Sequence, residues 1–145
     1  MKKLKDNRKF FPYVLFGYLT GGIYCPFALH GLVKDINEIC KEDGIKSTGP
    51  FTMILLTIVT LGLYPLFWYY RLGDMLRRAA KRREIRTEMN GGYMVLCYIV
   101  SLFVFGIALL IGLNQVFKLT NDLAADYNMR LATRLALERA EAENR

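Results

Sequence analysis

Residues 51–71, FTMILLTIVTLGLYPLFWYYR, decide the fold of this chain. The stretch holds no charged side chain before Arg71, and Gly62 and Pro65 interrupt it near its centre. An uncharged run of about 20 residues is long enough, as a helix, to cross the ~30 Å hydrocarbon core of a bilayer. The closing aromatic cluster and arginine are typical of a boundary between lipid and water. The stretch therefore predicts a membrane-crossing segment with a break in its middle.

Two further stretches have the same character, and they lie on either side of the first. Residues 10–33 carry no Asp, Glu, Lys or Arg, and neither do residues 93–117. The chain is 145 residues long, 53% hydrophobic and 23% charged, so its charges are confined to the connections. We therefore expect an all-α integral membrane protein with about three hydrophobic helical segments (about 10–33, 51–70 and 93–117), the first two broken at Gly and Pro.

Three regions follow from this pattern. Residues 1–9 form a basic N-terminal arm, residues 10–125 form the membrane domain, and residues 126–145 form a tail. Leucine or tyrosine recurs every fourth position from Leu119 to Leu135, which predicts an amphipathic C-terminal helix.

The first two segments are related at an offset of 40 residues. Both contain the pattern Thr-x-Gly-x-Tyr followed by a proline, and Phe105-Gly106-Ile107 is a fainter echo in the third segment. Gly and Pro interruptions at corresponding positions of two halves indicate a functional centre in transporters. The residues of this helix-break motif are Thr20, Gly22, Tyr24, Pro26, Thr60, Gly62, Tyr64 and Pro65.

These residues carry a resemblance to a bacterial family of membrane proteins, the domain-of-unknown-function family 4234. Thr60-Leu61-Gly62-Leu63-Tyr64 is similar to the Thr-Leu-Gly-Ile-Tyr core of that family, and Trp68-Tyr69-Tyr70-Arg71 to its aromatic run. Thr20-Gly21-Gly22-Ile23-Tyr24 fits with one change, and the resemblance covers roughly residues 10–125. It implies a small prokaryotic membrane protein, and it supplies no established activity and no catalytic residues.

Two geometries are open for the first two segments. The arm and the second connection together hold 12 Lys and Arg residues, against eight in the first connection and the tail. Three crossings with the N-terminus in the cytoplasm obey the positive-inside rule, and this is the geometry we favour. Alternatively, each segment turns back at its Gly-Tyr-Pro centre, with limbs of about 11 residues or ~16 Å, which places the arm and both connections on one face.

The sequence contains few residues that could carry out catalysis or bind a metal. The chain has one histidine and three widely spaced cysteines, so neither a Ser/His/Asp set nor a clustered metal site is expected. No phosphate-binding glycine loop is present, and we expect neither an enzyme nor a cofactor. The net charge of +7 is explained by membrane topology, so nucleic acid is not an expected partner.

Two sets of polar residues have both a structural and a functional interpretation. Asn114 and Gln115 are a polar pair in the third segment, suited to hydrogen bonds between helices or to the lining of a pore. The basic connection serves as a topology anchor or binds anionic lipid. The lipid-binding candidates are Arg77, Arg78, Lys81, Arg82 and Arg83.

Two functions remain after these exclusions. The first, which we favour, is a multi-pass membrane protein that acts as a structural or interaction module, self-associating or bound to a membrane partner protein. The alternative is an oligomeric membrane pore or transport protein with its site near the Gly-Tyr-Pro breaks. In both, the expected partners are the lipid bilayer and anionic lipids, and the expected location is the bacterial inner (cytoplasmic) membrane.

Overall fold

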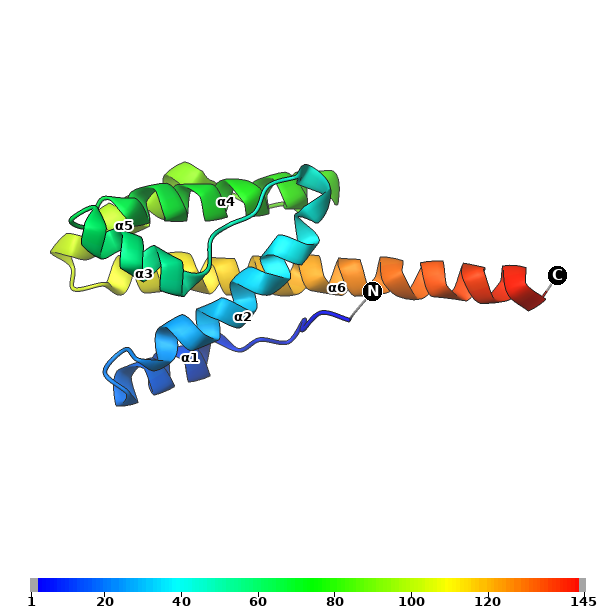
Figure 1. The fold of residues 1–145 in the computed structure, drawn as a ribbon, viewed down its shortest axis with the longest axis horizontal. Coiled ribbons are helices and arrows are strands. Elements are labelled where there is room, and N and C mark those ends of the chain that lie inside the picture. Colours follow the sequence, from blue (N-terminus) through cyan, green and yellow to red (C-terminus); the bar gives the residue numbers. More distant parts are fainter. Residues whose placement is uncertain (1–2, 144–145) are drawn as a thin grey trace.

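The computed structural model describes residues 3–143, which form six α-helices and one short 3-10 helix. The helices make three pairs that are joined by turns at residues 20–23, 60–63 and 104–106, and all three turns lie at one end of the molecule (Figure 1). The elements in chain order are α1 (Phe10–Leu19), α2 (Tyr24–Ile39), η1 (Lys41–Asp43), α3 (Pro50–Val59), α4 (Tyr64–Arg82), α5 (Gly91–Phe103) and α6 (Ile107–Glu143).

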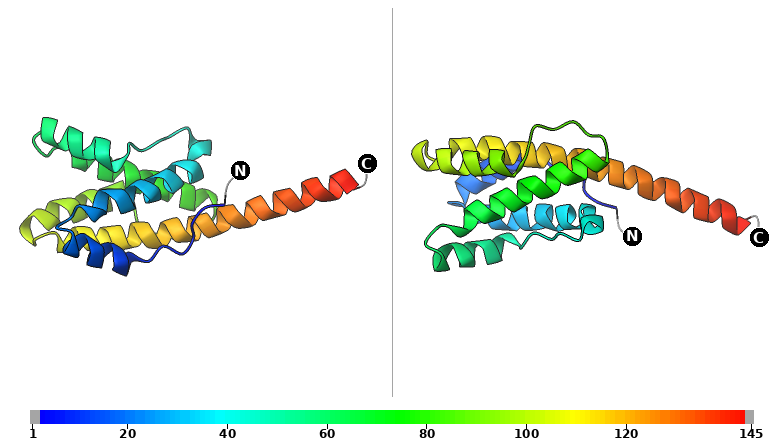
Figure 2. Two further views of the ribbon diagram at one scale, coloured as in Figure 1. Left: turned by 60° about the horizontal axis from the view of Figure 1, so that its bottom comes forward. Right: turned by 90° about the horizontal axis from the view of Figure 1, so that it is seen from above.

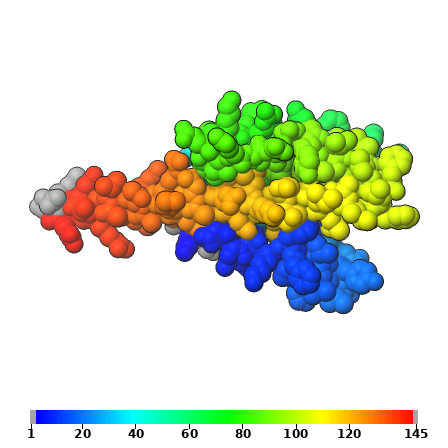
Figure 3. Space-filling model, turned by 180° about the vertical axis from the view of Figure 1, so that it is seen from behind, coloured from blue at the N-terminus to red at the C-terminus, as the bar shows by residue number. Residues whose placement is uncertain are grey.

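The long helix α6 runs through the middle of the molecule. Figure 3 shows it between the N-terminal segments on one side and the α4 and α5 region on the other. Both other views place the three turns at the same end, while the C-terminal part of α6 projects beyond the body at the opposite end (Figure 2). The connections at residues 40–49 and 83–90 lie away from the turns, so each helix pair runs out to the turn end and back.

The buried core lies in the half of the molecule away from the turns. On α4 the buried residues recur every three or four positions, the spacing of one helix face. The faces of α2 and α6 that meet this stripe have the same spacing. The central core residues are Leu32, Ile36 and Ile39 on α2, Leu72, Met75, Leu76 and Ala79 on α4, and Val116, Leu123 and Ala124 on α6.

Three asparagine side chains clamp extended backbone to this core. Asn128 accepts from the N–H of Leu4 at 2.8 Å and donates to its carbonyl at 2.9 Å. Asn121 makes the same two bonds to Arg8, at 3.0 and 2.8 Å. Asn37 makes them to Ser47, at 2.8 and 2.9 Å. The arm and the first connection are therefore held by paired hydrogen bonds, as an added strand is held by a sheet.

The sequence-based prediction of an integral membrane protein with about three crossing segments is wrong. Within residues 3–143, every helix is either too short or too polar to span a bilayer. The reason is that each apolar segment reverses in its middle, the third one at residues 104–106, which leaves limbs of about ten residues or ~15 Å. The predicted transmembrane, multi-pass topology is therefore wrong as well. The predicted location in the bacterial inner membrane, with a cytoplasmic N-terminus, is also wrong.

The clamp formed by Asn37 provides a test of this fold. Replacing Asn37 by Ala leaves the N–H and carbonyl of the buried Ser47 without partners, at a cost of about 1–3 kcal/mol. We expect the melting temperature in detergent micelles, followed by circular dichroism, to fall by roughly 5 °C. Asn7→Ala is the control, because Asn7 is exposed. Equal melting temperatures for the two variants would contradict the clamp.

Candidate functional site

The three turns have the same backbone conformation. At each turn an N–H bonds to the carbonyl five residues earlier: Gly22 to Gly17 at 2.7 Å, Gly62 to Thr57 at 2.8 Å, and Gly106 to Ser101 at 2.8 Å. This is the hydrogen bond of a helix that ends in a left-handed residue, and φ is +91°, +90° and +84° at the three glycines. The glycine of the motif therefore makes the reversal possible in all three pairs.

The threonine of the motif satisfies backbone groups at the first two turns. The Thr60 hydroxyl donates to the Leu56 carbonyl at 2.7 Å and accepts from the Tyr64 N–H at 2.9 Å. The Thr20 hydroxyl makes the same two bonds: it donates to the Phe16 carbonyl at 2.7 Å and accepts from the Tyr24 N–H at 3.0 Å. One side chain thus ends one helix and begins the next.

The prolines and tyrosines of the motif lie at the starts of the second helices. Pro65 is in the first turn of α4, where its missing N–H has no partner in any case, and Pro26 lies in the first turn of α2. The Tyr64 hydroxyl is 3.0 Å from the Thr48 hydroxyl, and the Tyr24 ring packs on Phe16 with centroids 5.5 Å apart. The prolines therefore begin helices and do not kink them.

The turn end carries nearly all of the exposed apolar surface, and we call it the apolar end. Within residues 3–143, all but three of the large hydrophobic side chains that are exposed belong to residues 11–27, 51–70 or 96–111; the exceptions are Met129, Leu135 and Leu137. Leu61 is 94% exposed and Phe105 fully exposed. Both have positive φ, at 51° and 47°, a conformation that costs a non-glycine residue roughly 1 kcal/mol or more.

Cations follow the uncharged stretches of most limbs. Moving away from the turns, the first charged residues on most limbs are basic and exposed. They lie about 7–11 residues from the turns along α1, α2, α4 and α6, or roughly 10–16 Å. We call Lys9, Lys34, Lys46, Arg71 and Lys118 the boundary cations. The sequence shows each of them, but that they all lie on the side away from the turns follows only from the directions of the helices.

The five basic residues that we predicted to bind anionic lipid lie farther from the apolar end. Arg77, Arg78 and Lys81 are exposed on the last turns of α4, about 6–10 residues beyond Arg71. Arg78 pairs with Asp74 at 2.8 Å. Arg82 and Arg83 turn instead toward carboxylates of other elements. The set does not form one surface.

The polar pair of the third segment lies at the start of α6. Asn114 is half-buried, and Gln115 is exposed beside residues 86–89, where it lines a hollow of about 250 Å³. An apolar hollow of about 650 Å³ separates the helix pairs near the turns, with Gly22, Met53 and Phe105 among its walls. In the part of the chain that the structure describes, no three His, Cys, Asp or Glu side chains are grouped as metal ligands.

Two ionisable groups of the core have raised pKa values. Burial raises the pKa of Cys40 to about 11, and its thiol points to the Met75 carbonyl. Burial also raises the pKa of Tyr69 above its ordinary value. Both groups therefore stay protonated near neutral pH, as packed core residues do.

Comparison with protein families gives a match. The model of a family described as a domain of unknown function (DUF4234) matches residues 48–124, which include α3, α4, α5 and the first half of α6. Neither a curated protein nor a solved structure matches the chain. Two of the three turns lie inside the matched region.

The role of the threonine can be tested by removing it and by adding it. Thr60→Val leaves the Tyr64 N–H without an acceptor, and we expect the free energy of unfolding in micelles to fall by about 1 kcal/mol. Val104 occupies the equivalent position in the third turn, so Val104→Thr is expected to raise the free energy of unfolding. Thr52→Val, at an exposed position on α3, is the matched control. A Thr60→Val change no larger than that of Thr52→Val would exclude this role.

Proposed function

This chain belongs to the family described as a domain of unknown function (DUF4234), and that description assigns no activity, so we propose a function from the geometry. The chain is an interaction module whose apolar end enters a lipid bilayer from one side, to the depth of one leaflet. It does not cross the bilayer. The observation that carries the proposal is the gathering of three apolar turns at one end of the molecule.

The amount and placement of exposed apolar surface require a partner. Single exposed leucines are ordinary on proteins, whereas a continuous apolar patch marks a site of interaction. Leu61 and Phe105 extend this argument, because each is held in a strained backbone conformation with its side chain directed away from the protein. In the first turn, the equivalent position is Gly21, which adopts the same conformation without strain.

The depth of the apolar end favours lipid over a protein partner. Its limbs are free of charge for roughly 10–20 Å, and one leaflet contributes about 15 Å of hydrocarbon. The boundary cations then lie at the level of the head groups, where a basic residue gains about 1 kcal/mol from anionic lipid.

The turns also meet a condition that lipid imposes on any backbone. A peptide group in hydrocarbon needs a partner within the protein. The glycine N–H groups of all three turns have one, and the Tyr24 and Tyr64 N–H groups have the threonine hydroxyls. These bonds lower the cost of placing the turns in hydrocarbon. The predicted self-association and the alternative of an oligomeric pore stay untested.

Charge placed at the tips of the turns tests this function. Leu61→Glu and Phe105→Glu each put a carboxylate where hydrocarbon is proposed, at a cost of about 3 kcal/mol. We expect each to lower binding to phosphatidylcholine vesicles about 100-fold in a flotation assay, and the double variant to lose binding. Both side chains are exposed, so the helical content followed by circular dichroism should not change.

The matched control is Leu137→Glu. Leu137 is exposed to a similar degree as many apolar-end residues, but it lies on the projecting part of α6. This variant should bind vesicles as the unmodified chain does. A double tip variant that still floats with vesicles would refute the proposal.

The boundary cations give a second and independent test. Replacing Lys9, Arg71 and Lys118 together by Gln is expected to weaken binding to vesicles with 30% phosphatidylglycerol by roughly 10- to 100-fold, at about 1 kcal/mol per residue. Binding to neutral vesicles should change little. The triple replacement of Arg77, Arg78 and Lys81 by Gln is the charge-matched control. If the control weakens binding as much, the boundary has been placed at the wrong level.

A further inference from the structure

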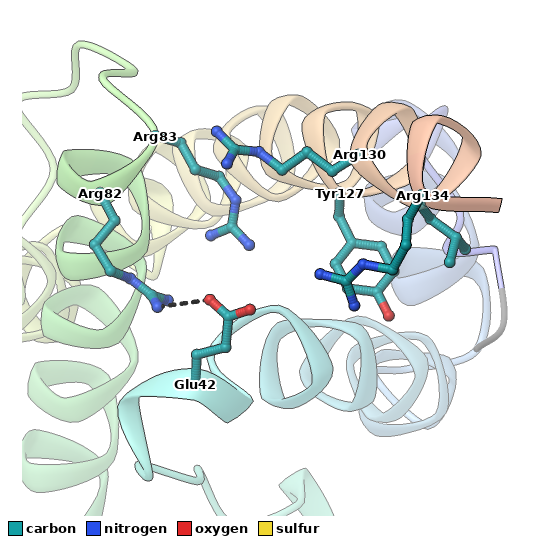
Figure 4. Close-up of a pocket in the computed structure, with 7 residues that line it drawn as sticks. Glu42, Arg82, Arg83, Tyr127, Arg130 and Arg134 are labelled. Atoms are coloured by element: carbon teal, nitrogen blue, oxygen red, sulfur yellow. Dashed lines mark hydrogen bonds and ion pairs between the residues drawn. The ribbon is translucent and has the colours of Figure 1, made fainter. Parts of the chain in front are cut away.

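A pocket lined by four arginines lies at the end of the molecule opposite the turns. Its volume is about 330 Å³, room for roughly ten waters. Figure 4 shows Arg83 directed into the opening, with Arg130 above it and Arg82 bonded to Glu42 at its edge. Tyr127 and Arg134 close the opposite side. We call it the arginine pocket.

Three elements that are distant in the sequence build this pocket. Arg82 ends α4 and Arg83 follows it, while Glu42 lies in η1. The remaining wall is one face of α6, where Tyr127, Arg130 and Arg134 are spaced three and four residues apart. The pocket therefore exists only when α4, η1 and α6 are packed together.

Two arginines of the pocket, Arg83 and Arg130, share one carboxylate. The Arg83 side chain is only 7% exposed, and its Nε lies 2.9 Å from the Asp126 carboxylate without the alignment of a hydrogen bond. Arg130 pairs with the same Asp126 oxygen at 2.8 Å. One carboxylate thus serves two guanidinium groups. The two Nη groups of Arg83 donate to the Ala79 and Ile39 carbonyls at 3.4 Å each, so its Nε is the donor that lacks an aligned acceptor.

The Tyr127 hydroxyl provides a second observation. Its oxygen is buried and makes no hydrogen bond within residues 3–143. Burial and the nearby Glu38 carboxylate raise the pKa of Tyr127, so the hydroxyl keeps its proton. A buried hydroxyl without a partner points to a missing acceptor at the pocket wall.

We propose that the arginine pocket binds a phosphate-bearing ligand, with the phosphate oxygens accepting from Arg83, Arg130 and Tyr127. Guanidinium forks match phosphate oxygens in pairs, and such charge-assisted bonds are about twice as strong as neutral ones. The ligand would supply a second anion beside Asp126, the carboxylate that Arg83 and Arg130 share.

The single carboxylate that lines the pocket does not block this use. Glu42 is 75% exposed and is held at the edge by Arg82 at 2.9 Å, so it leaves the interior to donor groups. Arg130 is 65% exposed, which gives a ligand access from solvent. The ligand must therefore bring acceptors and negative charge. A free phosphate compound and a lipid head group both have this chemistry.

Calorimetry on the full chain in detergent micelles tests the site. Inorganic pyrophosphate and the soluble short-chain lipid dihexanoyl phosphatidic acid are the two probes. We expect saturable binding of at least one of them, weakened tenfold or more by Arg130→Gln and by Tyr127→Phe. Arg139→Gln, which removes an exposed arginine farther along α6, should have no effect.

The pattern of outcomes decides the proposal. Binding that is lost in Arg130→Gln and kept in Arg139→Gln supports it, and the probe that binds identifies the source of the phosphate. Binding of neither probe, or an equal loss in both arginine variants, overturns it. The inference stands apart from the proposed function, because the assay uses no vesicles and the tip variant Phe105→Glu should bind the probe normally.

Discussion

The hydrogen bond from each turn glycine to the carbonyl five residues earlier is the interaction on which the rest of the structure depends. Gly22, Gly62 and Gly106 each end a helix after about ten residues and send the chain back alongside it. Without the left-handed conformation at these positions, the apolar segments would continue as single long helices. The three reversals also place the arm, both connections and the C-terminal part of α6 away from the turns.

This arrangement divides the molecule into two halves with opposite surfaces. In one half, α2, α4 and α6 bury an apolar stripe and expose polar side chains, as helices in water do. In the other half the same helices are apolar on the outside as well. The division occurs within single helices, at Lys34, Arg71 and Lys118. Each helix therefore contributes to both halves.

The local features of the fold could be predicted from the sequence, whereas the directions in which the helices run after each turn could not. The Thr-x-Gly-x-Tyr pattern indicated interruptions near Gly22 and Gly62, because glycine and proline act on their own neighbours. Whether the chain kinks or reverses there depends on contacts between limbs, which periodicity does not report. The third reversal was missed because Val104 replaces the threonine and no proline follows. The arginine pocket was missed because Arg83 and Asp126 are distant in the sequence, although the spacing of Tyr127, Arg130 and Arg134 was a visible signal.

The placement of every charged group on one side of the turns has a consequence for how the chain reaches its site of action. A crossing protein must carry at least one hydrophilic loop through hydrocarbon, a step with a high barrier that needs dedicated machinery. In the proposed mode of attachment, the parts that would enter lipid are uncharged turns whose glycine N–H groups are paired within the protein. Attachment to a bilayer can therefore follow synthesis and folding, and it can be reversible.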